Sequence, residues 1–179
     1  MKTLIIHPDD RTTDFLRGIY TTLPEHTLVT NGTKAQVNSL IDTHDRIIMC
    51  GHGTPMGLLS VNQFESFQYV IDSNTVPRIR GKDCIYIWCN ADKFVQSHSL
   101  KGLYSGMFVS EVNESILMGI GIVPQKVVDQ SNDCFANNMG SNIKMSLSEI
   151  YERVLHNYGI LAKTNIIAKY NVRRLFLDI

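Results

Sequence analysis

The sequence has no excess of charge of either sign and no long apolar run. Lys and Arg total 17, and Asp and Glu also total 17, so the net charge favours neither nucleic acid nor an anionic membrane as a partner. No apolar run approaches the roughly 18–20 residues that span a bilayer, and the apolar run in MKTLIIHPDD is too short for a signal peptide. We therefore expect a cytoplasmic protein without nucleic-acid or membrane partners.

The sequence also lacks paired cysteine motifs. No two of its four cysteines form a C-x-x-C pair, which gives little support to a zinc or thioredoxin-like motif. In the cytosol these thiols stay reduced. We find no internal repeat, low-complexity tract or linker, so we expect one domain over residues 1–179. We predict no cofactor and no metal.

Apolar runs and helical patterns alternate along the chain. We expect strands at residues 2–7, 26–31, 46–51, 84–89, 106–110 and 172–179, and helices at residues 9–23, 33–42, 62–72, 111–121 and 146–158. The helix at 62–72 is expected to carry Phe64, Phe67, Gln68 and Ile71 along one side, and Ser110 is expected to cap the helix at 111–121. This alternation predicts an α/β three-layer sandwich with a mostly parallel central sheet flanked by helices.

Two predicted strands end in residues with reactive side chains. RIIMC is followed by Gly51-His52-Gly53, and CIYIW is followed by Cys89. Reactive groups of parallel sheets gather at the carboxyl ends of the strands. If these two strands are neighbours, His52 and Cys89 emerge at the same edge of the sheet.

A thiol and an imidazole side by side suit nucleophilic catalysis. The thiolate is the attacking species, and a histidine can stabilise it or protonate a leaving amine. The oxyanion formed on attack needs backbone N–H donors, which the amides of Gly53 and Cys89 would supply. If Cys89 is the nucleophile, we expect its pKa to lie below the roughly 8.5 of a free cysteine.

Two segments together resemble a known family. RIIMCGHG is similar to the apolar block and His-Gly of the caspase-like (clan CD) cysteine peptidases, which include gingipains, legumain, separase and clostripain. CIYIWCNAD resembles that group's second apolar block, which ends in the nucleophile, and also a motif of the related CHAT domains. GLYSGMFVSEVNESILMGI and VRRLFLDI resemble the later strand, helix and final strand, so the resemblance covers residues 3 to about 121 and the C-terminus.

The resemblance implies a caspase-like fold and a cysteine endopeptidase that works through a thioester acyl-enzyme. Cys89 would be the nucleophile and His52 the general acid/base, with Gly53 and Cys89 as oxyanion donors. A protein or peptide would be the substrate, and a homodimer through the C-terminal strand is implied. Two positions depart from the pattern: Trp88 replaces a common alanine, and Ile87 replaces the aspartate of clostripain-like members, so cleavage after Arg or Lys is not indicated.

The residues expected to form the substrate pocket are charged or polar. Arg11 would bind an acidic substrate residue, whereas Asp9 or Asp10 would bind a basic one. Asp92, Ser110 and Glu111 border the same edge, and residues 90–105 are expected to form a loop along one wall. The alternative is that the charges after the first strand simply cap and solvate the first helix.

Three other functions compete with the peptidase. The first is a catalytically idle caspase-like module that binds a peptide or a partner protein. The second is a metal site made by Cys50, His52 and Cys89, for which no fourth ligand is evident. The third is a flavodoxin-like ligand binder, which the two acidic residues of HPDDRTT disfavour because they repel phosphate.

Overall fold

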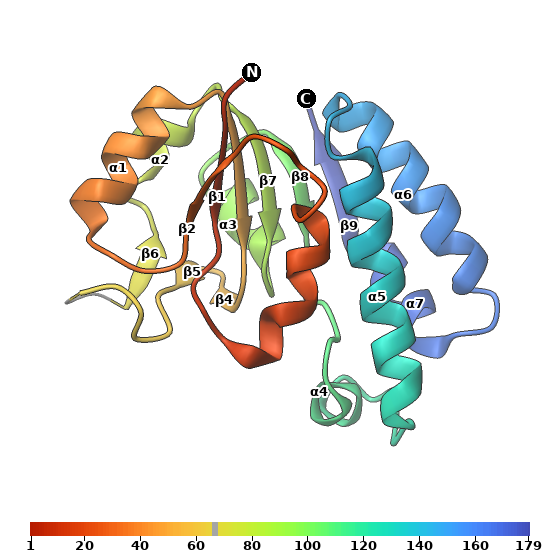
Figure 1. The fold of residues 1–179 in the computed structure, drawn as a ribbon. Coiled ribbons are helices and arrows are strands. Elements are labelled where there is room, and N and C mark those ends of the chain that lie inside the picture. The colour runs from red at the N-terminus through yellow and green to blue at the C-terminus, as the bar shows by residue number, and fades with distance from the viewer. Residues whose placement is uncertain (66–67) are drawn as a thin grey trace.

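A six-stranded sheet forms the centre of the molecule. The computed structural model describes residues 1–65 and 68–179. The strand order is β2-β1-β3-β7-β8-β9, and only the pairing of β8 with β9 is antiparallel (Figure 1). The strands are β1 (Thr3–Ile6), β2 (Thr27–Val29), β3 (Arg46–Cys50), β7 (Asp83–Ile87), β8 (Gly102–Ser105) and β9 (Leu175–Asp178). The predicted α/β architecture with a mostly parallel sheet is confirmed.

Helices cover both faces of this sheet. One face carries α1 (Lys34–Thr43), α2 (Val76–Ile79) and α3 (Ala91–Ser97). The other carries the 3-10 helix η1 (Arg11–Ile19), α5 (Gln125–Asn142) and α6 (Leu147–Leu161), followed by α7 (Ile166–Asn171) and the 3-10 turn η2 (Val172–Arg174). Side chains of a strand alternate between the faces: Ile47 and Met49 pack on the first face, Ile48 and Cys50 on the second. Within the described residues, no helix is long and apolar enough to cross a membrane.

A second, smaller sheet follows β3, and its last strand falls in the segment that is predicted to be helical. It consists of β4 (Gly53–Thr54), β5 (Gly57–Leu59) and β6 (Tyr69–Ile71), all antiparallel. The helix predicted at 62–72 is therefore wrong at β6, where the run Tyr69-Val70-Ile71 pairs with β5 and buries Ile71. Phe67, which was expected on that helix, lies outside the described residues, as does residue 66.

The fifth strand of the central sheet also differs from the prediction. The strand is GLYS (β8), whereas the predicted GMFVS segment is irregular, and the predicted loop at 90–105 contains both α3 and β8. The side chain of Asn171 replaces a neighbouring strand for this segment: its Oδ1 accepts from the N–H of Val109 and its Nδ2 donates to the Val109 carbonyl, both at 2.8 Å. These bonds satisfy the backbone of Val109 without a sheet.

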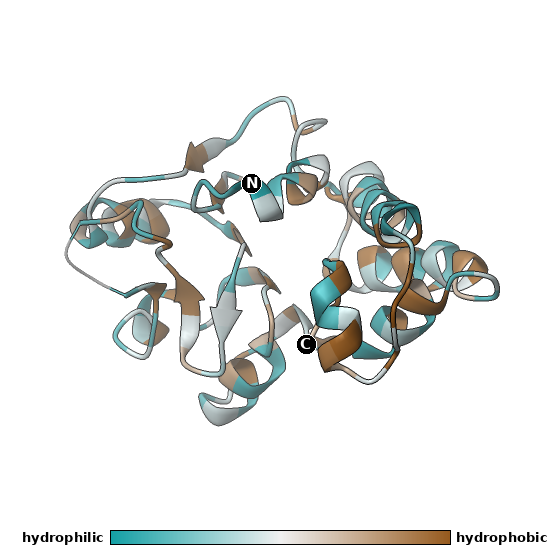
Figure 2. Ribbon diagram, turned by 90° about the horizontal axis from the view of Figure 1, so that it is seen from below, coloured by the Kyte–Doolittle hydropathy of each residue, from teal (hydrophilic) through white to brown (hydrophobic). Residues whose placement is uncertain are grey.

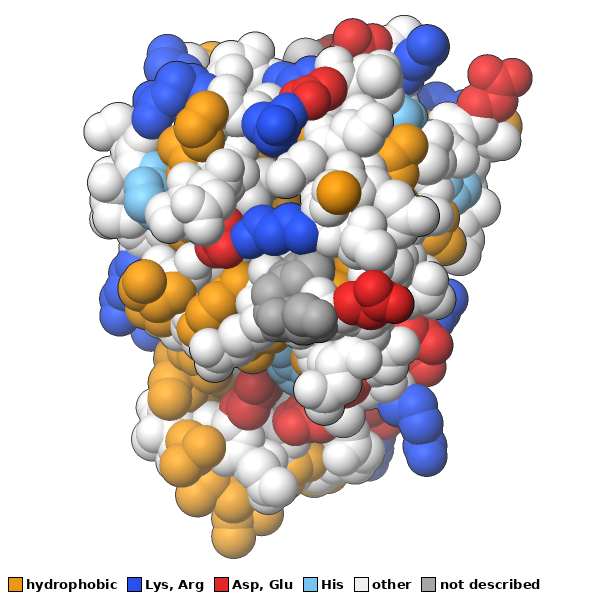
Figure 3. Space-filling model, turned by 90° about the vertical axis from the view of Figure 1, so that its left-hand side faces the viewer, with side chains coloured by type: hydrophobic (Ala, Val, Ile, Leu, Met, Phe, Trp, Pro, Cys, Tyr) orange, Lys and Arg blue, Asp and Glu red, His pale blue; other side chains and the backbone are white. Residues whose placement is uncertain are grey.

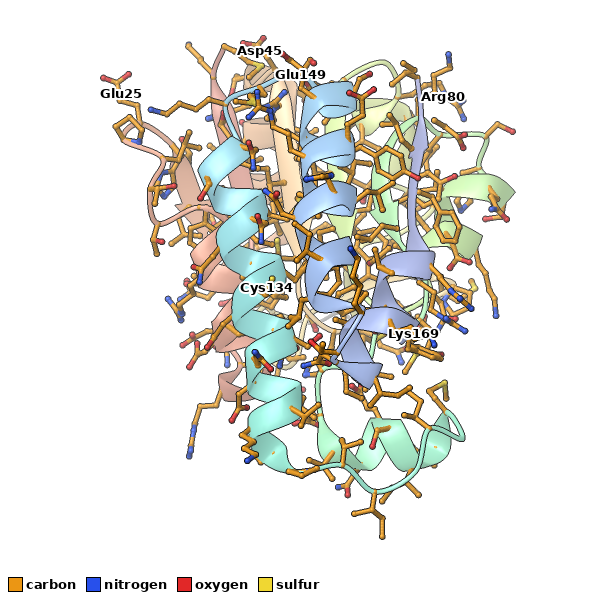
Figure 4. The ribbon with its side chains drawn as sticks, turned by 90° about the vertical axis from the view of Figure 1, so that its right-hand side faces the viewer. Glu25, Asp45, Arg80, Cys134, Glu149 and Lys169 are labelled. Atoms are coloured by element: carbon orange, nitrogen blue, oxygen red, sulfur yellow. The ribbon has the colours of Figure 1, made fainter. Side chains whose placement is uncertain are left out.

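The helices on the second face differ from the prediction in extent. The predicted helix at 9–23 is a 3-10 helix over Arg11–Ile19, and the helix expected to end before Gly159 continues to Leu161. Helix α5 was not predicted at all. It lies beside α6 over the sheet, with Cys134 in its middle, and α4 (Val112–Leu117) lies at the lower end of the molecule (Figure 4).

Candidate functional site

The strands that carry the two reactive residues are neighbours. β3 and β7 pair in parallel with Cys50 opposite Ile87, so the chain leaves both strands at the same edge of the sheet. His52 and Cys89 both line one small cavity at this edge. The predicted juxtaposition of the two strands is confirmed. The cavity has a volume of about 20 Å³, room for about one water molecule.

The thiol of Cys89 rests in its protonated form. Its Sγ donates a hydrogen bond to the Phe108 carbonyl oxygen at 3.5 Å. Burial, and then the nearby Glu114 carboxylate, raise the pKa of Cys89 to about 11. Both effects disfavour the thiolate. The expectation of a pKa below the free-cysteine value is therefore wrong, because the thiol is buried and faces a carboxylate.

The imidazole of His52 interacts with the loop that follows β1. Its Nε2 lies 2.6 Å from Oγ1 of Thr12 and 3.6 Å from Oδ1 of Asp10. Oγ1 of Thr12 donates its only hydrogen to Asp10 at 2.5 Å, so Nε2 of His52 carries the proton in the bond to Thr12. Hydrogen bonds from Thr12, and then the charge of His52, lower the pKa of Asp10. Among the described residues, no hydrogen bond joins His52 to Cys89.

Trp88 is a core residue that packs on Gly53. Its side chain is buried, its Nε1 donates to the Thr54 carbonyl at 3.2 Å, and its ring makes edge contacts with Tyr86 and Phe94. A Cβ at Gly53 would lie 2.0 Å from this ring. Glycine at this position is explained by the packing. The oxyanion role expected for the amides of Gly53 and Cys89 stays a prediction.

The residues expected to form the substrate pocket do not all lie at one cavity. Arg11, Ser110 and Glu111 line a second cavity of about 490 Å³, which shares Phe15 and Ser110 with the small one. Asp10 contacts His52 and lines neither cavity. Asp92 lies in the first turn of α3 and also lines neither of these cavities.

Glu114 organises the entrance to α4. Its Oε2 accepts from the backbone N–H groups of Ser110 and Glu111, at 2.7 and 3.1 Å. Glu111, and not Ser110 as expected, is the N-cap of α4. The carboxylate that raises the pKa of Cys89 is thus held in place by the loop itself.

Among the residues of the site that the sequence did not single out are Thr12, Asp129 and Asn132. Thr12 follows Asp10 by two residues, a spacing typical of an aspartate that accepts a bond from a nearby backbone N–H, and this signal was available. Asp129 and Asn132 line the larger cavity from α5, and no signal pointed to them because the helix itself was not predicted.

The arrangement does not assemble the metal site considered from the sequence. Cys50 is fully buried in the core, where desolvation raises its pKa far above the usual value. In the described part of the chain, no three His, Cys, Asp or Glu side chains are grouped to hold a metal ion.

Comparisons with known proteins assign no family. No family model matches the chain, and no curated protein matches it. A solved structure described as "flavone reductase" is similar with a TM-score of 0.36 and 13% identity, over 80% of this chain and 63% of that one. The chain thus matches less than two thirds of that structure, and a likeness this remote assigns no activity.

The prediction of a cysteine peptidase is corrected here. The resting geometry gives the physical reason for the correction: the thiol of Cys89 is protonated, and His52 is bonded to Thr12 instead.

Proposed function

We propose that the chain is a catalytically idle caspase-like module that binds a peptide or a partner protein at the carboxyl edge of its sheet. One observation carries this proposal: His52 and Cys89 line the same cavity but hydrogen-bond to different partners, Thr12 and Phe108. Nucleophilic catalysis needs a thiolate and a base within hydrogen-bond reach. Here the pair holds the edge loops in place.

The size of the dyad cavity supports the same proposal. With room for about one water, the cavity does not admit a peptide carbonyl beside the sulfur of Cys89. Phe15, Leu16 and Phe108 form much of its wall. A ligand would therefore bind outside the cavity, on the surface formed by α4 and the loops at the carboxyl ends of the strands.

An apolar patch beside this edge offers a surface for the ligand. Hydrophobic side chains gather at the lower end of the molecule (Figure 3), where α4 lies, and seen from below the ribbon of α4 and the segment after it carries hydrophobic residues (Figure 2). The exposed members of this apolar patch are Ile116, Leu117, Met118 and Ile122. Leu117 and Ile122 are 77% and 86% exposed. Contiguous exposed apolar groups mark interaction sites.

The test selects peptides on the immobilised protein from a displayed random library and measures their affinity by fluorescence anisotropy. We expect selected peptides to bind, and Leu117→Ser and Ile122→Ser to weaken binding by about tenfold or more. Ile160→Ser, which alters an exposed residue on α6, is the matched control and leaves the affinity unchanged.

Two results would overturn the proposal. One is cleavage of any selected peptide that disappears in Cys89→Ala. The other is a selection that enriches no peptide, or peptides whose affinity falls equally in the Ile160→Ser control.

A further inference from the structure

We infer that the larger cavity, between η1, α4 and α5, binds a small zwitterion with a free ammonium and a free carboxylate: a free α-amino acid or a short peptide with unblocked termini. Its volume of about 490 Å³ falls within the range of roughly 300–1,000 Å³ usual for ligand sites. The inference goes beyond the proposed function and does not depend on it.

Asn132 provides a buried acceptor that has no partner. Its side chain is 6% exposed, and its Nδ2 donates to the Ser110 carbonyl at 2.9 Å. This bond fixes the orientation of the amide, so the other atom is the oxygen acceptor. Within the described residues, Oδ1 of Asn132 is buried without a hydrogen-bond partner. Leaving such an atom unpaired costs about 1–3 kcal/mol. Because this oxygen is itself enclosed by the protein, a ligand does not bond to it directly, and Asn132 acts by holding the Ser110 carbonyl at the cavity wall.

Arg11 provides a cation on the opposite element. Within the described residues, its side chain forms no hydrogen bond and no ion pair, whereas Arg17 on the same 3-10 helix is held by Asp9 and Asp14. A guanidinium binds a carboxylate through two parallel hydrogen bonds. Arg11 is therefore available for the negative end of a ligand.

The charges lining the cavity are divided between its walls. Arg11 comes from η1, while Glu111 and Asp129 come from the start of α4 and from α5. One oxygen of Asp129 already accepts from Nε2 of Gln125 at 2.8 Å. A purely anionic ligand would face the two carboxylates, and a purely cationic one would face Arg11. Only a ligand with both charges matches the two walls.

The experiment is calorimetric titration of the full chain with the twenty free α-amino acids and with Ala-Ala. We expect at least one of these ligands to bind. If an amino acid binds and Ala-Ala does not, the ligand is the free amino acid; the reverse identifies the short peptide. Acetylating the amine or amidating the carboxylate of the best ligand should each weaken binding by about tenfold or more, because each removes one of the charges.

Substitutions of residues that line the cavity test whether the ligand binds there. Arg11→Gln and Asp129→Asn should weaken binding by about tenfold or more, and the exposed Arg153→Gln and Asp133→Asn should leave it unchanged. Cys89→Ala, in the smaller cavity, should also leave it unchanged. Asn132→Leu removes the unpaired oxygen but also the bond to Ser110, so Arg11→Gln is the deciding variant.

Three outcomes would overturn the inference: no binding by any unblocked ligand, equal binding by the blocked ligands, or full affinity in Arg11→Gln. None of them touches the peptide-binding proposal, whose test depends on Leu117 and Ile122.

Discussion

The indole of Trp88 occupies the space that a side chain at Gly53 would need. A Cβ at Gly53 would lie 2.0 Å from Cδ1 of Trp88 and 2.8 Å from the carbonyl oxygen of Gly57. Trp88 also donates to the carbonyl of Thr54. This contact joins the small sheet to the end of β7, next to Cys89. It therefore supports the loops of the candidate site.

Gly53→Ala should destabilise the fold by about 1–3 kcal/mol or more. The added methyl group would overlap the buried ring of Trp88 and the carbonyl oxygen of Gly57, and both would have to move away from it. Urea unfolding measures the change. Gly159→Ala is the control: this helical glycine has open space around its missing Cβ, so alanine should stabilise by up to about 1 kcal/mol. A neutral Gly53→Ala would contradict the close contact.

The sequence was enough to place His52 and Cys89 together. Both follow continuous apolar runs with β-branched residues, and such runs predict buried parallel strands whose ends share an edge. The contact between Trp88 and Gly53 was not predictable, because it depends on where β4 crosses the end of β7. The same holds for the pKa of Cys89, since burial and the position of Glu114 follow from packing.

Two errors in the predicted elements have identifiable physical causes. GLYS and GMFVS are both short apolar runs, and local pattern does not choose between them. Tertiary pairing does: β8 pairs with β7 and β9, while Asn171 satisfies the backbone of Val109. Helix α5 was missed because its sequence is rich in Asn, Ser and Asp, which have low helix propensity. Packing of Phe135 and Met139 on the second face stabilises it instead.

Iodoacetamide should label Cys89 slowly at neutral pH. Because its pKa is about 11, the thiolate fraction and hence the rate should rise about tenfold per pH unit between about pH 7 and 9. Mass spectrometry of the Cys89 peptide follows the rate. Glu114→Gln should speed labelling, since it removes a charge that raises the pKa of Cys89, and the exposed Glu152→Gln should not. Fast labelling of Cys89 at pH 7 would contradict the structure.

Asp83→Ala should lower the free energy of unfolding by about 3 kcal/mol. This value is near the lower end of the range for removing one partner of a buried ion pair, because Asp83 is partly exposed. Arg46 is 2% exposed, and its Nη2 and Nε donate to Asp83 at 2.7 and 3.1 Å. Removing the carboxylate leaves a buried cation. Asp42→Ala breaks the exposed pair with Arg78 and should cost at most about 1 kcal/mol. Chemical denaturation compares the two, and equal costs would argue against burial of the first pair.

His7 should make the fold sensitive to mild acid. Its ring is buried, with Nδ1 2.8 Å from the Tyr20 hydroxyl and Nε2 3.1 Å from Oγ1 of Thr13. Burial, and then the charge of Arg17, lower the pKa of His7 from 6.5 to about 4. Between these values the unfolded chain binds the proton and the folded chain does not. As the pH is lowered from about 6.5 to 4, the free energy of unfolding should therefore decrease by about 3 kcal/mol in total. Below about pH 4 this group should change it no further.

Urea titrations at half-unit steps from about pH 7 to 4 measure this slope. His7→Gln removes the titrating group, so its stability should depend less on pH across the window even if its stability at pH 7 is lower. The exposed His156→Gln serves as the control and should keep the wild-type slope. An unchanged slope in His7→Gln would mean that another group causes the acid sensitivity. The pKa of Asp10 is also lowered, from 3.8, so its effect belongs below the pH window of His7 and does not mimic it.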